Sequence, residues 1–262
     1  MSNQLSLFNI IEEKQTVIDI EKNILSSNCT DCSRSTFRIE NPKQKITISN
    51  GNPEGKFWIM GKSPGVNDGE TGIPYSHGSG KVLINMMEYV GLDWSTDCYA
   101  INPVFCADKD DKVPTVRELK ECSKYVDRII TAGSPALFIG LGSVAIEALT
   151  DKKIKISEIA GATQPIETKY GIPLWPFYHT ATLFKYHNNK PKLEEIQLSM
   201  LKTLNALKHE VDKIKGIREL TPKELSEEIS MTLPNISLMN SSIARKLRWT
   251  NFLKDIEEEL YG

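Results

Sequence analysis

Several features are missing from this 262-residue sequence, and each absence narrows the possibilities. No apolar run approaches the roughly 20 residues that a membrane-spanning helix needs. The N-terminus carries acidic residues and no basic segment ahead of its apolar residues, which is not typical of a secretory signal. We therefore expect a cytoplasmic protein that does not contact a membrane. The sequence also lacks an excess of charge of either sign, since it has 32 Lys and Arg and 34 Asp and Glu. Any nucleic-acid partner would therefore need a local basic surface.

Cysteine is scarce, and its five positions are informative. Structural disulfides are not expected in a cytoplasmic protein, so the pattern points to metal or redox chemistry. Cys29 and Cys32 form a C-x2-C pair, whereas Cys106 ends a predicted strand and Cys122 lies in a predicted helix. Four such thiolates suit a tetrahedral zinc or a four-cysteine iron–sulfur cluster, and spacing alone does not separate the two. Alternatively, Cys106 and Cys122 are small core residues, as Cys98 is expected to be.

The composition is that of a globular protein, and the chain suits one large domain with an appendage. Gly216 marks a break, and Thr221-Pro-Lys-Glu224 has the pattern of a helix start. We expect a domain over residues 1–215 and a C-terminal helical extension over 216–262. The extension contains a basic-aromatic cluster that is either a solvated face or a contact for nucleic acid or a protein partner: Arg245, Lys246, Arg248 and Trp249.

Apolar periodicity predicts strands that alternate with helices along the first 215 residues. The predicted strands are 57–60, 99–105, 136–142 and 172–178, and the predicted helices are 10–25, 82–90, one starting after Thr115, 143–149 and 193–214. Residues 33–56 are predicted to be irregular or weakly stranded. This alternation is typical of a parallel sheet with helices on both faces. The fold class is α/β, a three-layer α/β/α sandwich with a central parallel sheet and a small C-terminal helical appendage.

The Gly- and Pro-rich stretch 61–81 separates the first predicted strand from its helix. In open α/β proteins, ligands bind at the carboxyl ends of the strands, where this stretch is expected to lie. It is longer than most connections of its kind, which favours a binding loop over an ordinary connection.

The motifs, taken in order, resemble those of the iron–sulfur (family 4) uracil-DNA glycosylases over roughly residues 25 to 210. The family has a C-x2-C, a motif of the form G-E-x-P-G-x-x-E/D followed by G-x-P-F-x-G-x-x-G, then T-N-x-x-K-C, P-T-x-x-E-x-x-x-C and Y-H-P-S. The matching segments here are 29–32, 61–80, 101–106, 114–122 and 178–181. The resemblance implies an α/β sandwich and a [4Fe-4S] cluster held by Cys29, Cys32, Cys106 and Cys122.

The sequence departs from the family pattern mainly around the expected active site. Lys62 replaces the motif glutamate, Tyr75 the phenylalanine and His77 a glycine. Phe105 replaces the lysine before the third cysteine, and Thr180-Ala181 replace Pro-Ser. The cluster ligands are kept while these positions change, which indicates an atypical or modified base as the substrate.

The resemblance and the residue chemistry together predict Asp68 and His179 as catalytic residues. Asp68 would act on the sugar side, and His179 would donate a hydrogen bond to the departing base. The predicted base-binding residues are Gly61, Lys62, Tyr75, His77 and Asn102. The alternatives are structural: an exposed loop aspartate, a buried histidine, a tyrosine that caps the loop and a turn-forming asparagine. Lys62 would contact a phosphate, form a Schiff base or alter which base is accepted.

We expect a monofunctional DNA glycosylase with DNA as its partner, which flips its base out of the helix. One alternative is a glycosylase that removes hypermodified bases from phage DNA as antiviral defence. The other is a catalytically silent nucleic-acid-binding module. A protein partner, if there is one, would contact residues 216–262.

Overall fold

The structure is a computed structural model that describes residues 15–217. The expected helical extension, with its basic-aromatic cluster, lies outside the described residues apart from 216 and 217. The expected division between the two regions is therefore still a prediction. Within the described residues, no helix is both long enough and apolar enough to cross a membrane.

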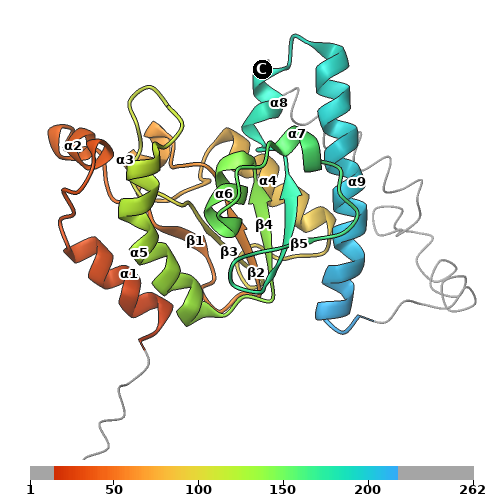
Figure 1. The fold of residues 1–262 in the computed structure, drawn as a ribbon, viewed down its shortest axis with the longest axis horizontal. Coiled ribbons are helices and arrows are strands. Elements are labelled where there is room, and N and C mark those ends of the chain that lie inside the picture. Colours follow the sequence, from red (N-terminus) through yellow and green to blue (C-terminus); the bar gives the residue numbers. More distant parts are fainter. Residues whose placement is uncertain (1–14, 218–262) are drawn as a thin grey trace, which may run out of the picture.

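A six-stranded mixed sheet forms the centre of the domain (Figure 1). The strand order is β1-β3-β2-β4-β6-β5. The strands are β1 Ser49–Gly51, β2 Phe57–Met60, β3 Cys98–Ile101, β4 Leu137–Leu141, β5 Ile166–Glu167 and β6 Pro173–Phe177. The four inner strands are parallel, as predicted, and both edge strands pair antiparallel to their neighbours. The inner strands are buried and read as continuous apolar runs, as expected for strands covered on both faces.

One face of the sheet is covered by helices α1 Val17–Ser26, α5 Val116–Gly133 and α6 Ser143–Thr150. Their apolar side chains pack against Trp58, Tyr99 and Phe138 of three neighbouring strands. The opposite face is covered by α4 Gly78–Tyr89, α8 Ala181–Lys185 and α9 Lys190–Ile214. Figure 1 shows α1 and α5 on one side of the sheet and α9 on the other. The predicted three-layer sandwich is confirmed.

Several local predictions were wrong. Residues 33–56 were predicted to be irregular or weakly stranded, and β1 agrees with this, but α2 Ser33–Glu40 does not. The serine-rich start of α2 has weak helix propensity, so its helical structure depends on buried contacts. The stretch 61–81 holds a short helix, α3 Val66–Thr71, and α4 already starts at Gly78. Strand β3 ends at Ile101, since Pro103 cannot continue a ladder of backbone hydrogen bonds. The four-residue helix α7, Ile156–Ile159, was also not predicted.

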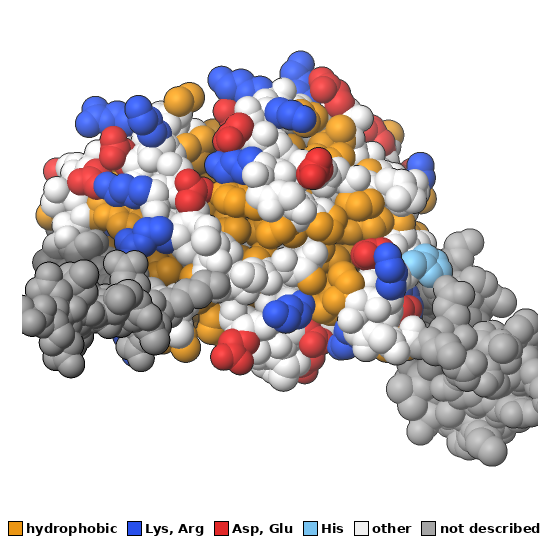
Figure 2. All heavy atoms as spheres, turned by 60° about the horizontal axis from the view of Figure 1, so that its bottom comes forward, with side chains coloured by type: hydrophobic (Ala, Val, Ile, Leu, Met, Phe, Trp, Pro, Cys, Tyr) orange, Lys and Arg blue, Asp and Glu red, His pale blue; other side chains and the backbone are white. Residues whose placement is uncertain are grey.

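The space-filling view brings the lower end of Figure 1 forward (Figure 2). Lys and Arg side chains are interspersed there with Asp and Glu, around a band of hydrophobic side chains. A nucleic-acid backbone is bound by clustered cations. The described part of this face shows mixed charge instead, so it does not have the character of a nucleic-acid interface.

Candidate active site and cysteine cavity

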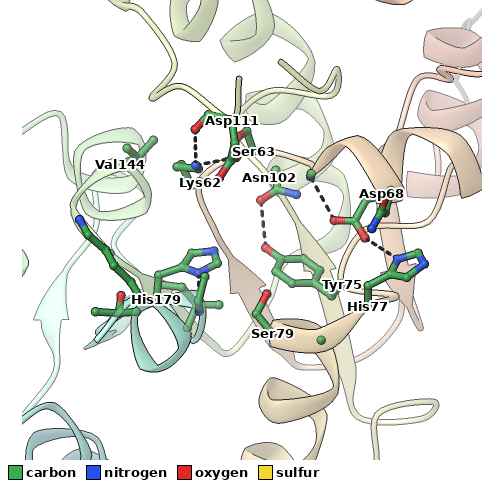
Figure 3. A pocket seen from close by; sticks show the side chains of 18 of the residues that line it. Lys62, Ser63, Asp68, Tyr75, His77, Ser79, Asn102, Asp111, Val144 and His179 are labelled. Carbon is green, nitrogen blue, oxygen red and sulfur yellow. Dashed lines mark hydrogen bonds and ion pairs between the residues drawn. The ribbon is translucent and has the colours of Figure 1, made fainter. Parts of the chain in front are cut away.

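A pocket of about 860 Å³ opens where the inner strands end, and we call it the strand-end pocket. The segments that follow β2, β3, β4 and β6 all contribute to its lining. Six of the seven residues predicted for catalysis or base binding line it: Lys62, Asp68, Tyr75, His77, Asn102 and His179 (Figure 3). The structure therefore brings together residues that are far apart in the sequence.

The remaining predicted residue, Gly61, stands behind the wall that Tyr75 and Asn102 form. The Tyr75 hydroxyl lies 2.8 Å from the Ile101 carbonyl oxygen, to which it donates, and 3.1 Å from Asn102 Oδ1. A Cβ atom at position 61 would lie only 2.5 Å from the Tyr75 hydroxyl and 2.8 Å from Asn102 Oδ1. Glycine at this position lets the phenol and the amide approach the end of β2.

Tyr75 itself is a buried wall residue and not an exposed platform. Its backbone is in the left-handed region, at φ 59°, and its ring packs edge-on against Trp94. Burial raises the pKa of the phenol well above its ordinary value, with a smaller contribution from the Asp68 charge. The hydroxyl therefore stays protonated, and Tyr75 presents part of its ring to the pocket.

Asp68 is held in place by three hydrogen bonds from the segments on either side of it. Its Oδ2 accepts from the Gly65 N–H at 3.2 Å, which closes the first turn of α3. Its Oδ1 accepts from the Ser76 N–H at 3.3 Å and from the Ser76 hydroxyl at 3.1 Å. The carboxylate thus has a structural role in the loop, and it still lines the pocket.

His77 is directed toward Asp68 (Figure 3). Its Nδ1 lies 3.5 Å from Asp68 Oδ1 and 2.9 Å from the Ser76 hydroxyl, and half of the side chain is exposed. The Ser76 hydroxyl donates its proton to the Asp68 carboxylate, which can only accept. The Ser76 oxygen therefore accepts from His77, and this favours the tautomer of His77 with a proton on Nδ1. His77 therefore connects the carboxylate with the rim of the pocket.

His179 follows β6 and has a defined tautomer. Its Nδ1 accepts a hydrogen bond from the Ala181 N–H at 3.2 Å, so the proton of the neutral ring is on Nε2. Burial lowers the pKa of His179 to about 4, and the positive charge of Lys62 contributes in the same direction. At neutral pH the ring is an uncharged donor through Nε2.

Lys62 lies on another part of the wall and forms an ion pair that the sequence did not reveal. Its ammonium donates to Asp111 Oδ1 at 2.7 Å and to the Asp111 carbonyl oxygen at 2.9 Å. Asp111 also lines the pocket, but nothing in the sequence of its charged loop distinguished it from its neighbours. Ser143, the first residue of α6, also lines the pocket and was not predicted, although its place two residues after β4 could have indicated it.

A second, smaller cavity is lined by all four predicted metal-binding cysteines: Cys29, Cys32, Cys106 and Cys122. We call it the cysteine cavity. Burial raises the pKa of Cys106 to about 11 and that of Cys122 to about 12, and neighbouring cysteine thiols add to both shifts. Cys98 does not line this cavity and is buried in β3 as a core thiol.

The surroundings of the cysteine cavity carry positive charge. Arg38 donates from Nη2 to the Cys29 carbonyl oxygen at 2.6 Å, and its charge lowers the pKa of Cys106 against the effect of burial. The Nε atom of Arg38 is buried without a hydrogen-bond partner in the described structure. Helix α2 begins directly after Cys32, which places its N-terminal end at the thiols. Both features suit an anionic group bound by the cysteines.

Among the described residues, no three His, Cys, Asp or Glu side chains converge closely enough to hold one metal ion. The four thiols instead surround a common space. A single zinc requires all its ligands within about 2.3 Å of one point, whereas a four-iron cluster is larger. The four thiols offer the ligand set of either a tetrahedral zinc or a four-cysteine iron–sulfur cluster.

The protein is an α/β protein whose sheet is covered by helices on both faces. Its polar pocket lies at the strand ends, where open α/β proteins bind their ligands, and the cysteine cavity is separate from it. The sequence profile of the uracil DNA glycosylase superfamily matches residues 48–202, more than half of the chain. The chain belongs to the uracil DNA glycosylase superfamily. It is accordingly a DNA glycosylase, a hydrolase of the N-glycosidic bond.

Individual relatives support this assignment. The chain is 24% identical over 178 residues to a type-4 uracil-DNA glycosylase of Thermotoga maritima, which covers 66% of this chain and 90% of the relative. It is 25% identical over 199 residues to a type-4 uracil-DNA glycosylase of Archaeoglobus fulgidus, covering 74% and 94%. It is also similar to part of a DNA polymerase of Bacillus phage SP01, at 28% identity over 129 residues, 49% of this chain and 13% of the polymerase.

Proposed function

We propose that the strand-end pocket hydrolyses the N-glycosidic bond of a nucleotide flipped out of DNA, with an atypical or modified base as its substrate. The observation that carries this proposal is the meeting of Asp68, Asn102 and His179 in one pocket. Cleavage of this bond needs charge control both at the sugar and at the departing base. The pocket offers a carboxylate for the first and a neutral hydrogen-bond donor for the second.

On the base side, His179 would donate from Nε2 to the oxygen or nitrogen that gains negative charge as the bond breaks. A donor fixed in advance stabilises that charge without reorganising at the moment of reaction. The Ala181 N–H holds the ring in the required tautomer. Asn102 and Tyr75 would bound the same side of the pocket and contact the base edge and face.

On the sugar side, Asp68 would orient a water or stabilise the positive charge that develops on the ring. Its hydrogen bonds from Gly65 and Ser76 keep the carboxylate fixed. His77 would support the same carboxylate from the pocket rim. In this proposal His77 acts mainly through Asp68 and less through the base.

The four cysteines of the cysteine cavity would hold a [4Fe-4S] cluster. Such a cluster would cross-link α2, the segment after β3 and α5, and it takes no part in the steps above. The buried Nε of Arg38 and the N-terminal end of α2 support binding of an anionic group there.

The residues that differ from the family motif support a base other than uracil. Lys62, Tyr75 and His77 all line the strand-end pocket, so the differences alter the surface that meets the substrate. The relatives named as uracil-DNA glycosylases keep uracil as a candidate. Removal of hypermodified bases from phage DNA is the second candidate, supported by the same three pocket residues.

The test is a screen of purified protein against DNAs of differing base content, with mass spectrometry of the released bases. The proposal predicts release of a free base from at least one DNA and loss of that release in Asp68→Asn. Binding to DNA without release of any base would favour a silent nucleic-acid-binding module. Release of uracil with no preference for a modified base would overturn the substrate part of the proposal alone.

A further inference from the structure

The ion pair between Lys62 and Asp111 is built into the wall of the strand-end pocket (Figure 3). Lys62 directly follows Gly61, the residue after β2, and three quarters of its side chain is buried. Its ammonium is held by two oxygens of one residue, the carboxylate and the carbonyl of Asp111. Two acceptors on one residue fix the position of an ammonium group better than a single surface ion pair does.

Asp111 is itself held by the segment that connects Cys106 with α5. Its backbone is in the left-handed region, at φ 52°, which aspartate tolerates better than most residues. Asp108 Oδ1 accepts from the backbone N–H groups of Asp110 and Lys112, at 2.9 and 3.1 Å. The Lys112 carbonyl accepts from Arg34 Nη2 at 2.8 Å. The segment is thus held by Asp108 within the loop and by the buried Arg34 on the C-terminal side of Asp111.

His179 is exposed to the charges of this pair. The charged groups that act on its imidazole are Lys62, Asp111 and Asp68, in addition to the effect of burial. Lys62 disfavours the imidazolium, whereas the two carboxylates favour it. Removal of the ammonium would therefore leave the influence of the two carboxylates unopposed by a positive charge, and the charged form of the ring would become easier to populate.

We propose that Lys62, positioned by Asp111, places a fixed positive charge on the base side of the pocket, and that this charge acts together with burial to hold His179 in its neutral, Nε2-protonated form. Lys62 takes this role where the family motif has a glutamate. Asp111 is a positioning residue, because it acts on His179 through the ammonium that it holds. The effect on His179 is independent of any substrate, and only its benefit for base release rests on the proposed function.

The experiment follows the ring carbon and nitrogen signals of His179 by NMR during a pH titration. In Lys62→Gln the pKa of His179 should rise by about one unit, the usual effect of a nearby charge. The same substitution is then made in an Asp111→Ala background. If Asp111 holds the ammonium near the ring, the shift caused by Lys62→Gln should be clearly smaller in that background.

Lys112→Gln is the matched control, since Lys112 forms an exposed ion pair with Asp110 in the same segment. It should leave the His179 titration unchanged. Lys62→Met serves as a second variant if Lys62→Gln does not fold, as judged by circular dichroism. An unchanged His179 titration in both Lys62 variants would overturn the proposal. Equal shifts with and without Asp111 would overturn the positioning role of Asp111.

Base release provides the link to function. In Lys62→Gln, the acid limb of the pH–rate profile should move to higher pH, by the same amount as the pKa of His179 measured by NMR. A wild-type protein that releases no base but shows the NMR shift would count against the proposed function and not against this inference. If the pKa of His179 rises in Lys62→Gln but the acid limb of the pH–rate profile stays in place, the claim that Lys62 assists base release is overturned.

Discussion

Arg34 and Glu118 form a buried ion pair, with 3.1 Å between Nε and Oε2. Arg34 is in the first turn of α2, two residues after Cys32, and Glu118 is in α5, one helical turn before Cys122. The Ser33 hydroxyl and the Thr115 N–H also donate to the Glu118 carboxylate. Arg34 further donates to the Cys106 carbonyl oxygen. The pair therefore joins the three chain segments that line the cysteine cavity.

Substitution of Arg34 by Met should destabilise the fold by about 3–5 kcal/mol, the usual cost of removing one partner of a buried pair. Glu118 would remain as a buried charge with fewer partners. Urea unfolding followed by circular dichroism would measure the loss. As a control, Lys124→Met removes one partner of an exposed pair with Asp31 and should cost at most about 1 kcal/mol. A cost for Arg34→Met as small as that of the control would contradict this prediction.

The same pair predicts a pH dependence of stability. Burial alone would raise the pKa of Glu118, but hydrogen bonds from Ser33, Thr115 and Arg34 outweigh it and hold the pKa below its ordinary value. A carboxyl group with a lowered pKa in the folded state stabilises the protein above its unfolded pKa. That contribution should be lost as the pH falls below about 4.5. In Glu118→Gln this part of the acid dependence should be absent from the unfolding midpoints.

The cysteine cavity gives a prediction for metal content. Protein purified without oxygen should be brown, with about four iron atoms per chain by the four-cysteine ligation rule. Cys122→Ser should lower the iron content and the unfolding temperature together. Cys98→Ser is the control, because that thiol is in the sheet core and should leave the iron content unchanged. Colourless protein with one zinc per chain would refute the cluster.

The fold was predictable where the sequence has strong apolar periodicity. The four inner strands and helices α5 and α9 bury continuous apolar faces, so their patterns identified them. Helix α2 was missed because Arg34 and Ser35 are buried by polar contacts, which leave no apolar pattern. The edge strands β1 and β5 are too short to show an apolar pattern, and only pairing with β3 and β6 makes them strands.

The pocket residues were predictable in part for a related reason. Asp68, Asn102 and His179 follow strands or occupy motif positions. They were identified both because ligands bind at the carboxyl ends of parallel strands and because of the family resemblance. Asp111 was not predictable, since its role depends on a loop path set by Arg34 and Asp108. The orientation of His77 toward Asp68 also depends on the local turn around Ser76.

For catalysis, Asp68→Asn should slow base release by about 10²-fold or more if the carboxylate acts as a base. His179→Ala should cost a comparable factor, because a positioned donor is lost. Since the pKa of His179 is about 4, activity should not change with its protonation between pH 5 and 8. It should decline as the pH falls through about 4. Single-turnover release of base across this range would measure both effects, and an inflection near pH 6.5 that vanishes in His179→Ala would contradict the neutral ring.

DNA binding should be local and electrostatic. Lys185 lines the strand-end pocket, so Lys185→Gln should weaken binding and reduce the salt slope of log K by about one. Lys22 lies in α1, which covers the other face of the sheet, and Lys22→Gln is the control. Fluorescence anisotropy at several salt concentrations gives the slopes. Equal slopes for both variants and the wild type would place the phosphate contacts elsewhere.

The tight contact between Gly61 and Tyr75 permits a rescue experiment. In Gly61→Ala the new Cβ would lie 2.5 Å from the Tyr75 hydroxyl and 3.3 Å from Cζ, so the ring has to move. We expect base release to fall at least tenfold, because the shifted ring changes the pocket wall next to Asn102. Tyr75→Phe alone loses the hydrogen bond to the Ile101 carbonyl and should cost about 1 kcal/mol of stability.

Combined, Gly61→Ala and Tyr75→Phe should be less harmful than the sum of the two changes. The hydroxyl that clashes most closely with the new Cβ is gone, and the Cζ contact at 3.3 Å needs only a small adjustment. The Asn102 Oδ1 contact at 2.8 Å remains, but without the phenol hydroxyl this amide has lost its hydrogen bond to Tyr75 and can move away. The favourable coupling should appear both in the unfolding free energy and in the rate of base release, since contacting residues do not act additively. Gly91→Ala changes a glycine whose added Cβ would meet no atom within 4 Å, although its positive φ makes the substitution strained. It therefore controls for a general loss of stability: it should lower stability without any coupling to Tyr75→Phe. Additive effects of Gly61→Ala and Tyr75→Phe would show that the phenol does not depend on the glycine for its place in the pocket wall.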